Sequence, residues 1–498
     1  MSVFNSPRLY LLLAFFTGLL VPLSFAPREW AWLALPLMAV YVWLVFAVNA
    51  KQAFLRGWAF GTGMFLTGIY WVYLSMHDYG YVPVIFAALL TLILALFLGL
   101  FPALVAMLAV RMWTTRDGIR LLMVLPTLWV LMEWVRSWLF TGFPWLNLGA
   151  SQVTTPLAGY APVVGELGMS WLVMVTAATL VYLLNQKGRK RLAVISVVAL
   201  LWASAFLLER INWTEKAAPD FSVALVQGNI DQLIKWNPEH LEEIIKTYVD
   251  LSRPHWEADV MIWPETAIPA FYHHVPDIIN QLQSMAQAEN TEMLIGIPYR
   301  DTNTGEYYNS VIALGSGVSF YHKRHLVPFG EFIPFQAWIS DVLDFMGLPM
   351  SGFSRGDVNQ ATLTTGEFQA GMTICYEIIF NGEVMQSLPE AHYLVNVSNN
   401  TWFGDSAMPF QQLQMARLRA LESQRYVLSA TNNGVSAVIN HHGEVIAQSP
   451  QFQSHVIRAS VEPRTGVTPF SRYKNIPILV LVVLMLILAH LLRPKLPS

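Results

Sequence analysis

The stretch Gly371-Met372-Thr373-Ile374-Cys375-Tyr376-Glu377 is the starting point for interpreting this chain, because it holds the only cysteine among 498 residues. Its pattern predicts a short apolar strand that ends at the thiol. Free cysteine is one of the most frequently buried residue types, so a structural role is the first alternative. A thiol becomes a strong nucleophile only as a thiolate, which requires a neighbouring base or cation. The question is therefore which groups of the chain could activate Cys375.

The composition is that of a membrane protein, with 54% hydrophobic and 13% charged residues and 18 Trp. A net charge of −3 argues against nucleic-acid binding. A single cysteine excludes an intrachain disulfide. No Cys/His pattern has the spacing of a zinc site, and we expect neither a metal nor a cofactor.

Eight apolar runs approach or exceed the length that crosses a hydrocarbon core of about 30 Å. They predict spans at about 10–26, 30–48, 57–76, 84–110, 121–140, 162–184, 192–208 and 476–492. Charges of ordinary frequency return between the seventh and eighth runs. We therefore expect a seven-helix transmembrane domain at 1–212, a catalytic domain at 213–471, and a C-terminal transmembrane helix with a cytoplasmic tail at 472–498.

The basic residues between these runs predict the orientation. They gather before the first run, after the second, fourth and sixth, and after the eighth, whereas the alternate loops are poor in them. The positive-inside rule then places both termini in the cytoplasm and residues 213–471 on the outer side of the membrane. The basic residues are Arg8, Lys51, Arg56, Arg111, Arg116, Arg120, Lys187, Arg189, Lys190, Arg191, Arg493 and Lys495.

The predicted outer domain combines two hydrophobic periods. Helical patterns lie at about 238–251, 276–289 and 410–423, between some of the short apolar runs that read as strands. This interleaving predicts a layered α/β sandwich. The strand-like runs are 222–226, 260–263, 293–297, 311–314, 370–374, 393–397, 427–430 and 435–439.

Two further polar groups stand near the ends of strand-like runs, where loops carry chemistry. Glu265 follows Val260-Met261-Ile262-Trp263-Pro264, and a half-buried carboxylate there would suit a general base. Lys323 lies in an aromatic and apolar stretch and could stabilise a thiolate or an oxyanion. The alternatives are a surface glutamate in a turn and a solvated basic turn, because Arg324 and two histidines adjoin the lysine.

Three short motifs, in their order along the chain, resemble the Glu-Lys-Cys triad of the nitrilase superfamily. They are Trp-Pro-Glu-Thr at 263–266, Tyr-His-Lys-Arg-His-Leu-Val-Pro-Phe-Gly-Glu at 321–331 and Ile-Cys-Tyr-Glu at 374–377. Together with the eight predicted spans, the chain resembles the apolipoprotein N-acyltransferases, a family of bacterial inner-membrane enzymes. The resemblance covers nearly the whole chain. It includes the segments 223–230 and 396–404, and Glu133-Trp134 together with Thr141-Gly142-Phe143-Pro144-Trp145.

This resemblance implies a nitrilase-like αββα sandwich on the periplasmic side of the inner membrane. It also implies a ping-pong acyltransferase: Cys375 takes the sn-1 acyl chain of a phospholipid, phosphatidylethanolamine by analogy, as a thioester. The acyl chain then passes to the N-terminal amine of diacylglyceryl-cysteine in apolipoproteins, which completes lipoprotein maturation. Glu265 would be the base, Lys323 the stabiliser of the tetrahedral intermediate and Cys375 the nucleophile. Supporting or substrate-contacting positions would be Glu331, Tyr376, Glu377, Trp236 and, more weakly, Asn309.

Other interpretations stay open at the level of sequence. A membrane-tethered carbon-nitrogen hydrolase, an amidase or nitrilase, would keep the thiol but use water as acceptor. A transporter or scaffold with a decayed enzyme domain is disfavoured by the complete triad. Residues 342–348 could form a lid or merely pack as a loop. Glu133 and Arg136, three apart on a predicted membrane helix, suggest a structural pair or a headgroup contact. We expect a monomer.

Overall fold

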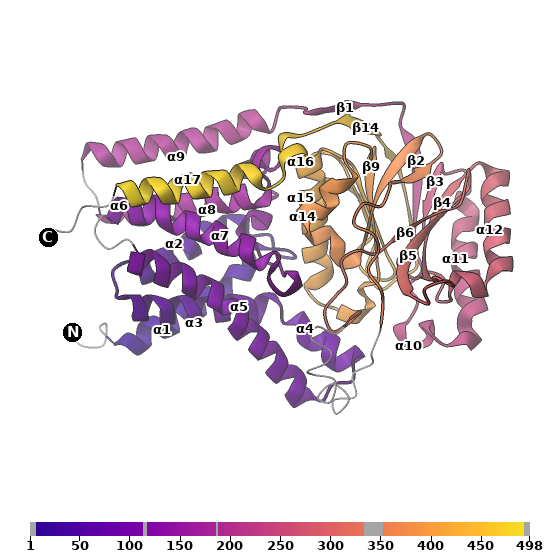
Figure 1. Cartoon of the computed structure of the whole chain (residues 1–498), viewed down its shortest axis with the longest axis horizontal. Coiled ribbons are helices and arrows are strands. Elements are labelled where there is room, and N and C mark those ends of the chain that lie inside the picture. The colour runs from indigo at the N-terminus through magenta and orange to yellow at the C-terminus, as the bar shows by residue number, and fades with distance from the viewer. Residues whose placement is uncertain (1–5, 113–116, 186–187, 333–351, 493–498) are drawn as a thin grey trace. The chain divides into compact units, whose positions relative to one another are not determined.

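The computed structural model describes residues 6–112, 117–185, 188–332 and 352–492. The chain forms two compact units. The first comprises Met1–Tyr73, Pro83–Ile211 and Tyr473–Ser498, and it is helical. The second comprises Leu74–Val82 and Asn212–Arg472, and it contains the two large sheets (Figure 1). The sequence range predicted for a lid, 342–348, lies outside the described residues.

The helical unit is built from strongly apolar segments. Four described stretches are long and apolar enough to cross a membrane: Pro7–Ser24, Val84–Met112, Pro156–Leu184 and Arg189–Leu208. The stretches Ala31–Phe46 and Ile476–Leu491 are apolar but shorter. The helices of this unit with ten residues or more are α1 (Pro7–Leu20), α2 (Ala34–Phe46), α3 (Ala50–Gly68), α5 (Val84–Met112), α7 (Leu125–Arg136), α8 (Ala161–Asn185), α9 (Arg189–Leu208) and α17 (Ile476–Leu491).

Several predicted spans differ from the observed helices in their bounds. The first, predicted to end near residue 26, ends as α1 at Leu20, and the third, predicted to end near residue 76, ends as α3 at Gly68. α3 begins at Ala50 rather than near residue 57, because the side chain of Asn49 caps it by accepting the N–H of Gln52 at 3.0 Å. α7 ends at Arg136 rather than near residue 140, where the chain turns through a left-handed Phe140 with φ 53°. α3 and α7 are not among the four described stretches that are long and apolar enough to cross a membrane. The number of spans therefore stays a prediction.

The second unit contains two six-stranded mixed sheets. In the first, the parallel strands β2 (Phe221–Gln227), β3 (Val260–Ile262) and β4 (Glu292–Arg300) form the centre. In the second, the parallel strands are β8 (Phe368–Ile374), β9 (Tyr393–Ser398) and β10 (Val427–Thr431). Antiparallel strands flank both centres: β13 (His455–Val461), β5 (Tyr307–Leu314) and β6 (Ser319–His322) in the first sheet, and β12 (Val445–Gln448), β11 (Ala437–Ile439) and β7 (Leu363–Thr365) in the second.

The sheets and helices of this unit form four layers. β2 shows the reason, because successive residues of a strand face opposite sides. Val223 and Leu225 join the core between the two sheets, whereas Ala224 and Val226 join the core under α11 (Leu241–Ser252) and α12 (Pro276–Glu289). In Figure 1, α11 and α12 lie on one side of the sheets and α15 (Met408–Ser423) lies on the other. The order helix, sheet, sheet, helix is the sandwich that the resemblance implied.

All eight predicted strands overlap observed ones, and all three predicted helices are present. The sequence did not indicate β6, β7, β12 and β13, nor the pair β1 (Thr214–Lys216) and β14 (Arg464–Gly466). These strands are short or lie at sheet edges, where half-exposed polar residues interrupt the apolar pattern. The segment Leu74–Val82 also packs in the second unit, where Tyr79 meets Trp402 with ring centroids 6.3 Å apart.

Candidate active site

Cys375 stands at the carboxyl end of a central strand. β8 ends at Ile374, and Cys375 begins the short 3-10 helix Cys375–Ile379 with a left-handed φ of 54°. A non-glycine residue in this region costs about 1–3 kcal/mol and persists only where its surroundings enforce it. Gln412 of α15 contributes to this, because its Nε2 donates to the carbonyl oxygen of Cys375 at 3.0 Å and lies 4.0 Å from Sγ. The thiol is therefore presented from a sharp turn.

Glu265 follows β3 and is held by neutral donors. Its Oε1 accepts from Nδ2 of Asn309 at 2.7 Å, and its Oε2 accepts from the main-chain N–H of Asn399 at 2.8 Å. The residue is only 8% exposed. A Cβ on Gly296 of β4 would lie 2.3 Å from the carbonyl oxygen of Pro264, so glycine is required for this close approach. The carboxylate is thus oriented by two hydrogen bonds.

Lys323 lies just after β6 and is 1% exposed. Its Nζ is 2.8 Å from Oε1 of Glu331 and 3.7 Å from Oε1 of Glu265. Its main-chain N–H donates to the carbonyl oxygen of Asn309 at 2.8 Å. Burial lowers the pKa of Lys323, but the carboxylates of Glu331 and Glu265 outweigh burial and raise the pKa above its ordinary value. The lysine is therefore a stable cation between two carboxylates.

Glu331, one of the supporting positions that the resemblance implied, and Asn309, the weaker candidate, join this cluster. Nδ2 of Asn309 also donates to Oε1 of Glu331 at 3.2 Å, so one amide bridges Glu331 and Glu265. The second oxygen of Glu331 accepts from the main-chain N–H of Val327 at 2.8 Å. The cluster consequently fixes both carboxylates by contacts that do not depend on the lysine.

The thiol lies within the electrostatic field of this cluster. Burial and the charge of Glu265 raise the pKa of the Cys375 thiol to about 12, against a lowering by Lys323. The thiol is therefore protonated at neutral pH and requires a base before it can attack. Glu265, Lys323 and Cys375, which the sequence pattern selected, are thus close enough in the structure to interact with one another.

Glu377 links the loop that carries Lys323 to the end of β8. It is fully buried, and its carboxylate accepts four hydrogen bonds, two of them from main-chain groups just after Lys323. These come from Arg324 N (2.6 Å), His325 N (3.0 Å), Ile374 N (2.7 Å) and the hydroxyl of Tyr321 (2.9 Å). Glu377 therefore positions residues on both sides of the candidate site rather than reacting.

Tyr376 and Trp236 differ in their surroundings. Tyr376 is buried, with its ring 5.7 Å from that of His325 and 5.1 Å from that of Phe380. Trp236 is 52% exposed at the end of α10 (Gln232–Lys235). Within the described part of the chain, no hydrogen bond or ring contact joins Trp236 to Cys375, so its predicted role stays a prediction.

The sequence did not indicate three residues of the candidate site. Gln412 and Asn399 contact Cys375 and Glu265 as described above, and Nζ of Lys235 donates to the main-chain oxygen of Glu265 at 3.1 Å. The sequence signal for Lys235 was weak, because a lysine next to a tryptophan resembles a surface residue. Among the residues that the structure describes, no group of three His, Cys, Asp or Glu side chains could hold a metal ion.

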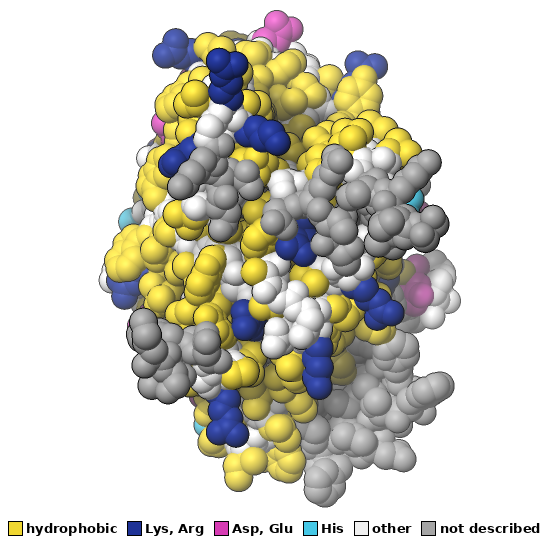
Figure 2. Space-filling view, turned by 90° about the vertical axis from the view of Figure 1, so that its left-hand side faces the viewer, with side chains coloured by type: hydrophobic (Ala, Val, Ile, Leu, Met, Phe, Trp, Pro, Cys, Tyr) yellow, Lys and Arg dark blue, Asp and Glu magenta, His cyan; other side chains and the backbone are white. Residues whose placement is uncertain are grey.

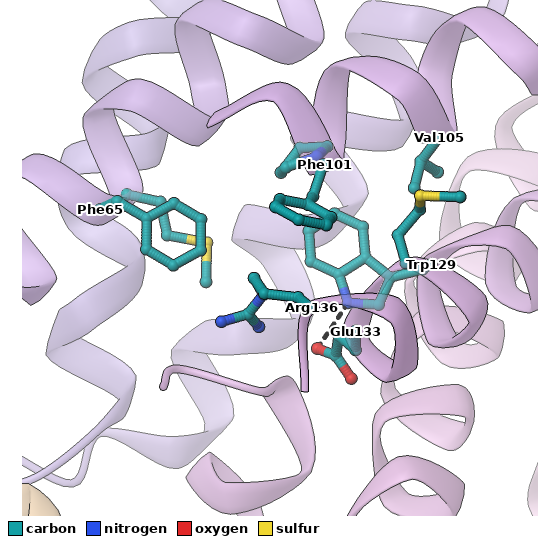
Figure 3. A pocket seen from close by; sticks show the side chains of 9 residues that line it. Phe65, Phe101, Val105, Trp129, Glu133 and Arg136 are labelled. Carbon is teal, nitrogen blue, oxygen red and sulfur yellow. Dashed lines mark hydrogen bonds between the residues drawn. The ribbon is translucent and has the colours of Figure 1, made fainter. Parts of the chain in front are cut away.

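Glu133 and Arg136 of the helical unit line a pocket within that unit. Figure 3 shows Glu133 and Arg136 beside Trp129, Phe65 and Phe101. Oε1 of Glu133 accepts from Nε1 of Trp129 and from the main-chain N–H of Leu148, both at 2.8 Å. The guanidinium of Arg136 donates to the carbonyl oxygens of Phe143 and Trp145 and to Oδ1 of Asn147. These contacts tie the loop after α7 to the helix, and the predicted pairing of Glu133 with Arg136 stays a prediction.

Both units match families of known proteins. Residues 17–179 match the family model of the apolipoprotein N-acyltransferase N-terminal domain, and residues 222–469 match that of carbon-nitrogen hydrolase. The apolipoprotein N-acyltransferase of Methylococcus capsulatus is 40% identical over 472 residues, which are 94% of this chain and 93% of that protein. That of Vibrio vulnificus is 38% identical over 487 residues, 96% of each chain.

Among solved structures, Saccharomyces cerevisiae Nit3, a member of branch 10 of the nitrilase superfamily, covers 52% of this chain and 96% of its own, with a TM-score of 0.37 and 18% identity. The family assignment itself comes from the two curated relatives, whose identity extends over nearly the full length of both chains. By that full-length identity, this chain belongs to the apolipoprotein N-acyltransferase family.

Proposed function

We propose that this chain transfers the sn-1 acyl chain of a phospholipid to the N-terminal amine of diacylglyceryl-cysteine in apolipoproteins. The names of its relatives support acyl transfer to apolipoproteins. The observation that carries the mechanism is the convergence of Glu265, Lys323 and the single thiol Cys375. A nucleophile, a base and a fixed cation are the parts that covalent acyl transfer requires.

In the first half-reaction, Glu265 takes the proton of Cys375 and the sulfur attacks the ester carbonyl carbon. A carbon–sulfur bond forms, and the negative charge that develops on the carbonyl oxygen is stabilised by the ammonium of Lys323. The tetrahedral intermediate then breaks its carbon–oxygen bond. The proton on Glu265 passes to the leaving oxygen, which releases a lysophospholipid and leaves a thioester on Cys375.

In the second half-reaction, the neutral amine of the diacylglyceryl-cysteine attacks the thioester carbonyl carbon. Glu265 accepts a proton from the attacking nitrogen, a carbon–nitrogen bond forms and the carbon–sulfur bond breaks. The proton returns to the sulfur, so the enzyme ends in its starting state with an amide as product. Because the acyl group is stored on Cys375, the two lipid substrates can use one pocket in turn.

The other predicted positions have supporting roles in this scheme. Glu331 and Asn309 hold Lys323 and Glu265, and Glu377 holds the loop that carries Lys323. Tyr376 and the exposed Trp236 are the predicted contacts to substrate. A phosphatidylethanolamine donor is proposed by family analogy, and the enzyme is proposed to act as a monomer without a cofactor.

We also propose that the chain is an inner-membrane protein with eight spans and with both termini in the cytoplasm. Residues 1–212 would form the transmembrane domain, 213–471 the periplasmic catalytic domain and 472–498 the last helix with its tail. The face of the helical unit in Figure 2 supports this orientation, because Lys and Arg predominate among its charged groups. In Figure 1, α17 ends at the same end of this unit at which α1 begins.

Labelling of single cysteines tests this topology. In a Cys375→Ala background, Ser316→Cys should react in whole spheroplasts with a membrane-impermeant thiol reagent, and Lys190→Cys should react only after lysis. Labelling of Lys190→Cys in intact spheroplasts would refute the orientation.

Mass spectrometry tests the chemistry. Incubation with phospholipid should add one acyl group to the wild-type protein, on Cys375, and a lipopeptide amine should remove it as an N-acyl product. Cys375→Ala should give neither. An adduct elsewhere or full activity of Cys375→Ala would refute the proposal, and release of the acyl chain only as free fatty acid would identify a hydrolase.

A further inference from the structure

Lys235 is a buried ammonium in the catalytic unit that the two half-reactions leave without a role. The residue is 1% exposed, and its Nζ donates to the main-chain oxygen of Glu265 at 3.1 Å. Burial lowers the pKa of Lys235 to about 8, against the attraction of Glu265. A buried charge is costly, and an apolar side chain of similar size is often as stable or more stable in its place. The charge itself therefore requires an explanation.

The helix that carries Lys235 holds Glu265 at two points. Gln232 and Lys235, three residues apart on α10, are both buried, whereas Leu233 is 69% exposed. Oε1 of Gln232 accepts from Nδ2 of Asn399 at 2.8 Å. The main-chain N–H of Asn399 in turn donates to the carboxylate of Glu265. One turn of helix thus fixes the backbone of Glu265 through Lys235 and its carboxylate through Asn399.

Lys235 adds a second ammonium to the charges near the reacting pair. Glu377, which also acts on Lys323, lies beside Arg324. Glu265, Lys323 and Glu331 act on Cys375, and Glu265 acts on Lys235. The remaining ionisable group of this helix turn, Asp231, caps α10 by accepting the N–H of Leu233 at 2.9 Å. Two carboxylates then face two ammonium groups. Loss of the proton of Cys375 makes the site more negative, and a nearby ammonium favours that step.

We propose that Lys235 is a positioning residue for Glu265, which fixes the backbone of that residue and places a positive charge beside the carboxylate that takes the proton of Cys375. This assignment rests on the acyl transfer proposed above, but it makes a claim about the free enzyme that needs no lipid. Lys235 does not touch the reacting atoms and acts only through Glu265.

Alkylation of the thiol tests the assignment, because Cys375 is the only cysteine of the chain. The rate with iodoacetamide is measured against pH on the full-length protein in detergent. Lys235→Met should move the acidic limb of this profile upward by about one pH unit, the low end of the effect of a neighbouring opposite charge. Below the limb, alkylation should be about tenfold slower. Lys235→Arg should stay within about threefold of the wild type.

Lys246→Met is the matched control, since Lys246 is an exposed lysine of α11 paired with Asp250 at 3.0 Å. Its profile should coincide with that of the wild type. An unshifted limb in Lys235→Met would overturn the assignment. An unchanged rate would exclude both parts of it, and a rate lowered equally at every pH would leave only the backbone contact, without the charge effect that the assignment requires. If thermal melting shows that Lys235→Met does not fold, the shorter neutral variant Lys235→Gln takes the same test. A shifted limb in a protein that forms no acyl adduct would refute the proposed function and leave Lys235 as the positioning residue of the pair.

Discussion

Replacing Glu331 with glutamine should slow acyl-enzyme formation strongly while leaving the fold intact. The buried ammonium of Lys323 is 2.8 Å from Glu331 and 3.7 Å from Glu265. At an effective dielectric constant of about 20, these separations correspond to attractions of roughly 6 and 4 kcal/mol before desolvation is subtracted. The nearer carboxylate is thus the stronger partner. Without its charge, Lys323 should pair with Glu265 alone.

This rearrangement should weaken the base and the oxyanion stabiliser together. In glutamine an NH2 donor replaces one carboxylate oxygen, so the side chain cannot accept from Lys323 at one position and from the N–H of Val327 at the other, as Glu331 does. A hydrogen bond to a charged group contributes about 1.5–3 kcal/mol, which corresponds to a roughly 10- to 150-fold slower reaction.

The assay is the rate at which the acyl adduct forms on Cys375 in a single turnover, followed by mass spectrometry. Glu367→Gln, in the exposed turn between β7 and β8, serves as the control and should react at the wild-type rate. A Glu331→Gln rate within threefold of the wild type would refute the reasoning. So would a decrease that merely matches a loss of folded protein.

Four other substitutions test neighbouring parts of the structure. Asn309→Leu removes the 2.7 Å donor of Glu265 and should slow adduct formation by about tenfold or more in the same assay. Glu377→Gln replaces an acceptor of four hydrogen bonds, so it should lower the free energy of unfolding by about 2 kcal/mol or more in a denaturant titration. Trp236→Ala should change that free energy by less than about 0.5 kcal/mol, because the residue is exposed, yet raise the KM for phospholipid. Lys235→Met should change how the free energy of unfolding depends on pH. Burial lowers the pKa of Lys235 from 10.5 in the unfolded chain to about 8 in the folded protein. Between pH 8 and 10.5 the unfolded chain therefore binds more protons than the folded protein. The wild type should therefore gain roughly 3 kcal/mol of stability relative to the variant as pH rises through this window, and a constant difference in denaturant titrations would contradict it.

The sequence was most informative where an apolar strand stops at a polar residue. Glu265 and Cys375 follow central strands whose residues are buried on both faces, and such strands give continuous apolar runs that mark their own ends. The sequence also indicated Lys323, which directly follows an apolar and aromatic stretch. The strand in that stretch, β6, was too short to be predicted. The roles of these residues came from the family resemblance rather than from the pattern.

The sequence was uninformative where a residue owes its position to partners far along the chain. Lys235 is buried because Glu265, 30 positions away, accepts its hydrogen bond, and Gln232 is held by Asn399, 167 positions away. Nothing near these residues in sequence signals either contact. Likewise β13 carries Arg458 and half-exposed residues, and it pairs with β2 only because that strand offers an open sheet edge.

In the candidate site, uncharged groups orient the side chain of Glu265, and this determines how different variants should change the pH profile. Neutral groups orient the carboxylate of Glu265, through Asn309 and Asn399, and the main chain of Cys375, through Gln412. Lys235, which can titrate, holds only the main chain of Glu265. The neutral groups do not titrate, so their contacts persist while the charged residues gain or lose protons. A shift of the pH profile in a variant therefore reports a change of charge near Cys375, and a loss of rate at every pH reports a change of position. Charge variants of Glu331 and amide variants of Asn309 should thus differ in the form of the profile even where their rates at pH 7 coincide.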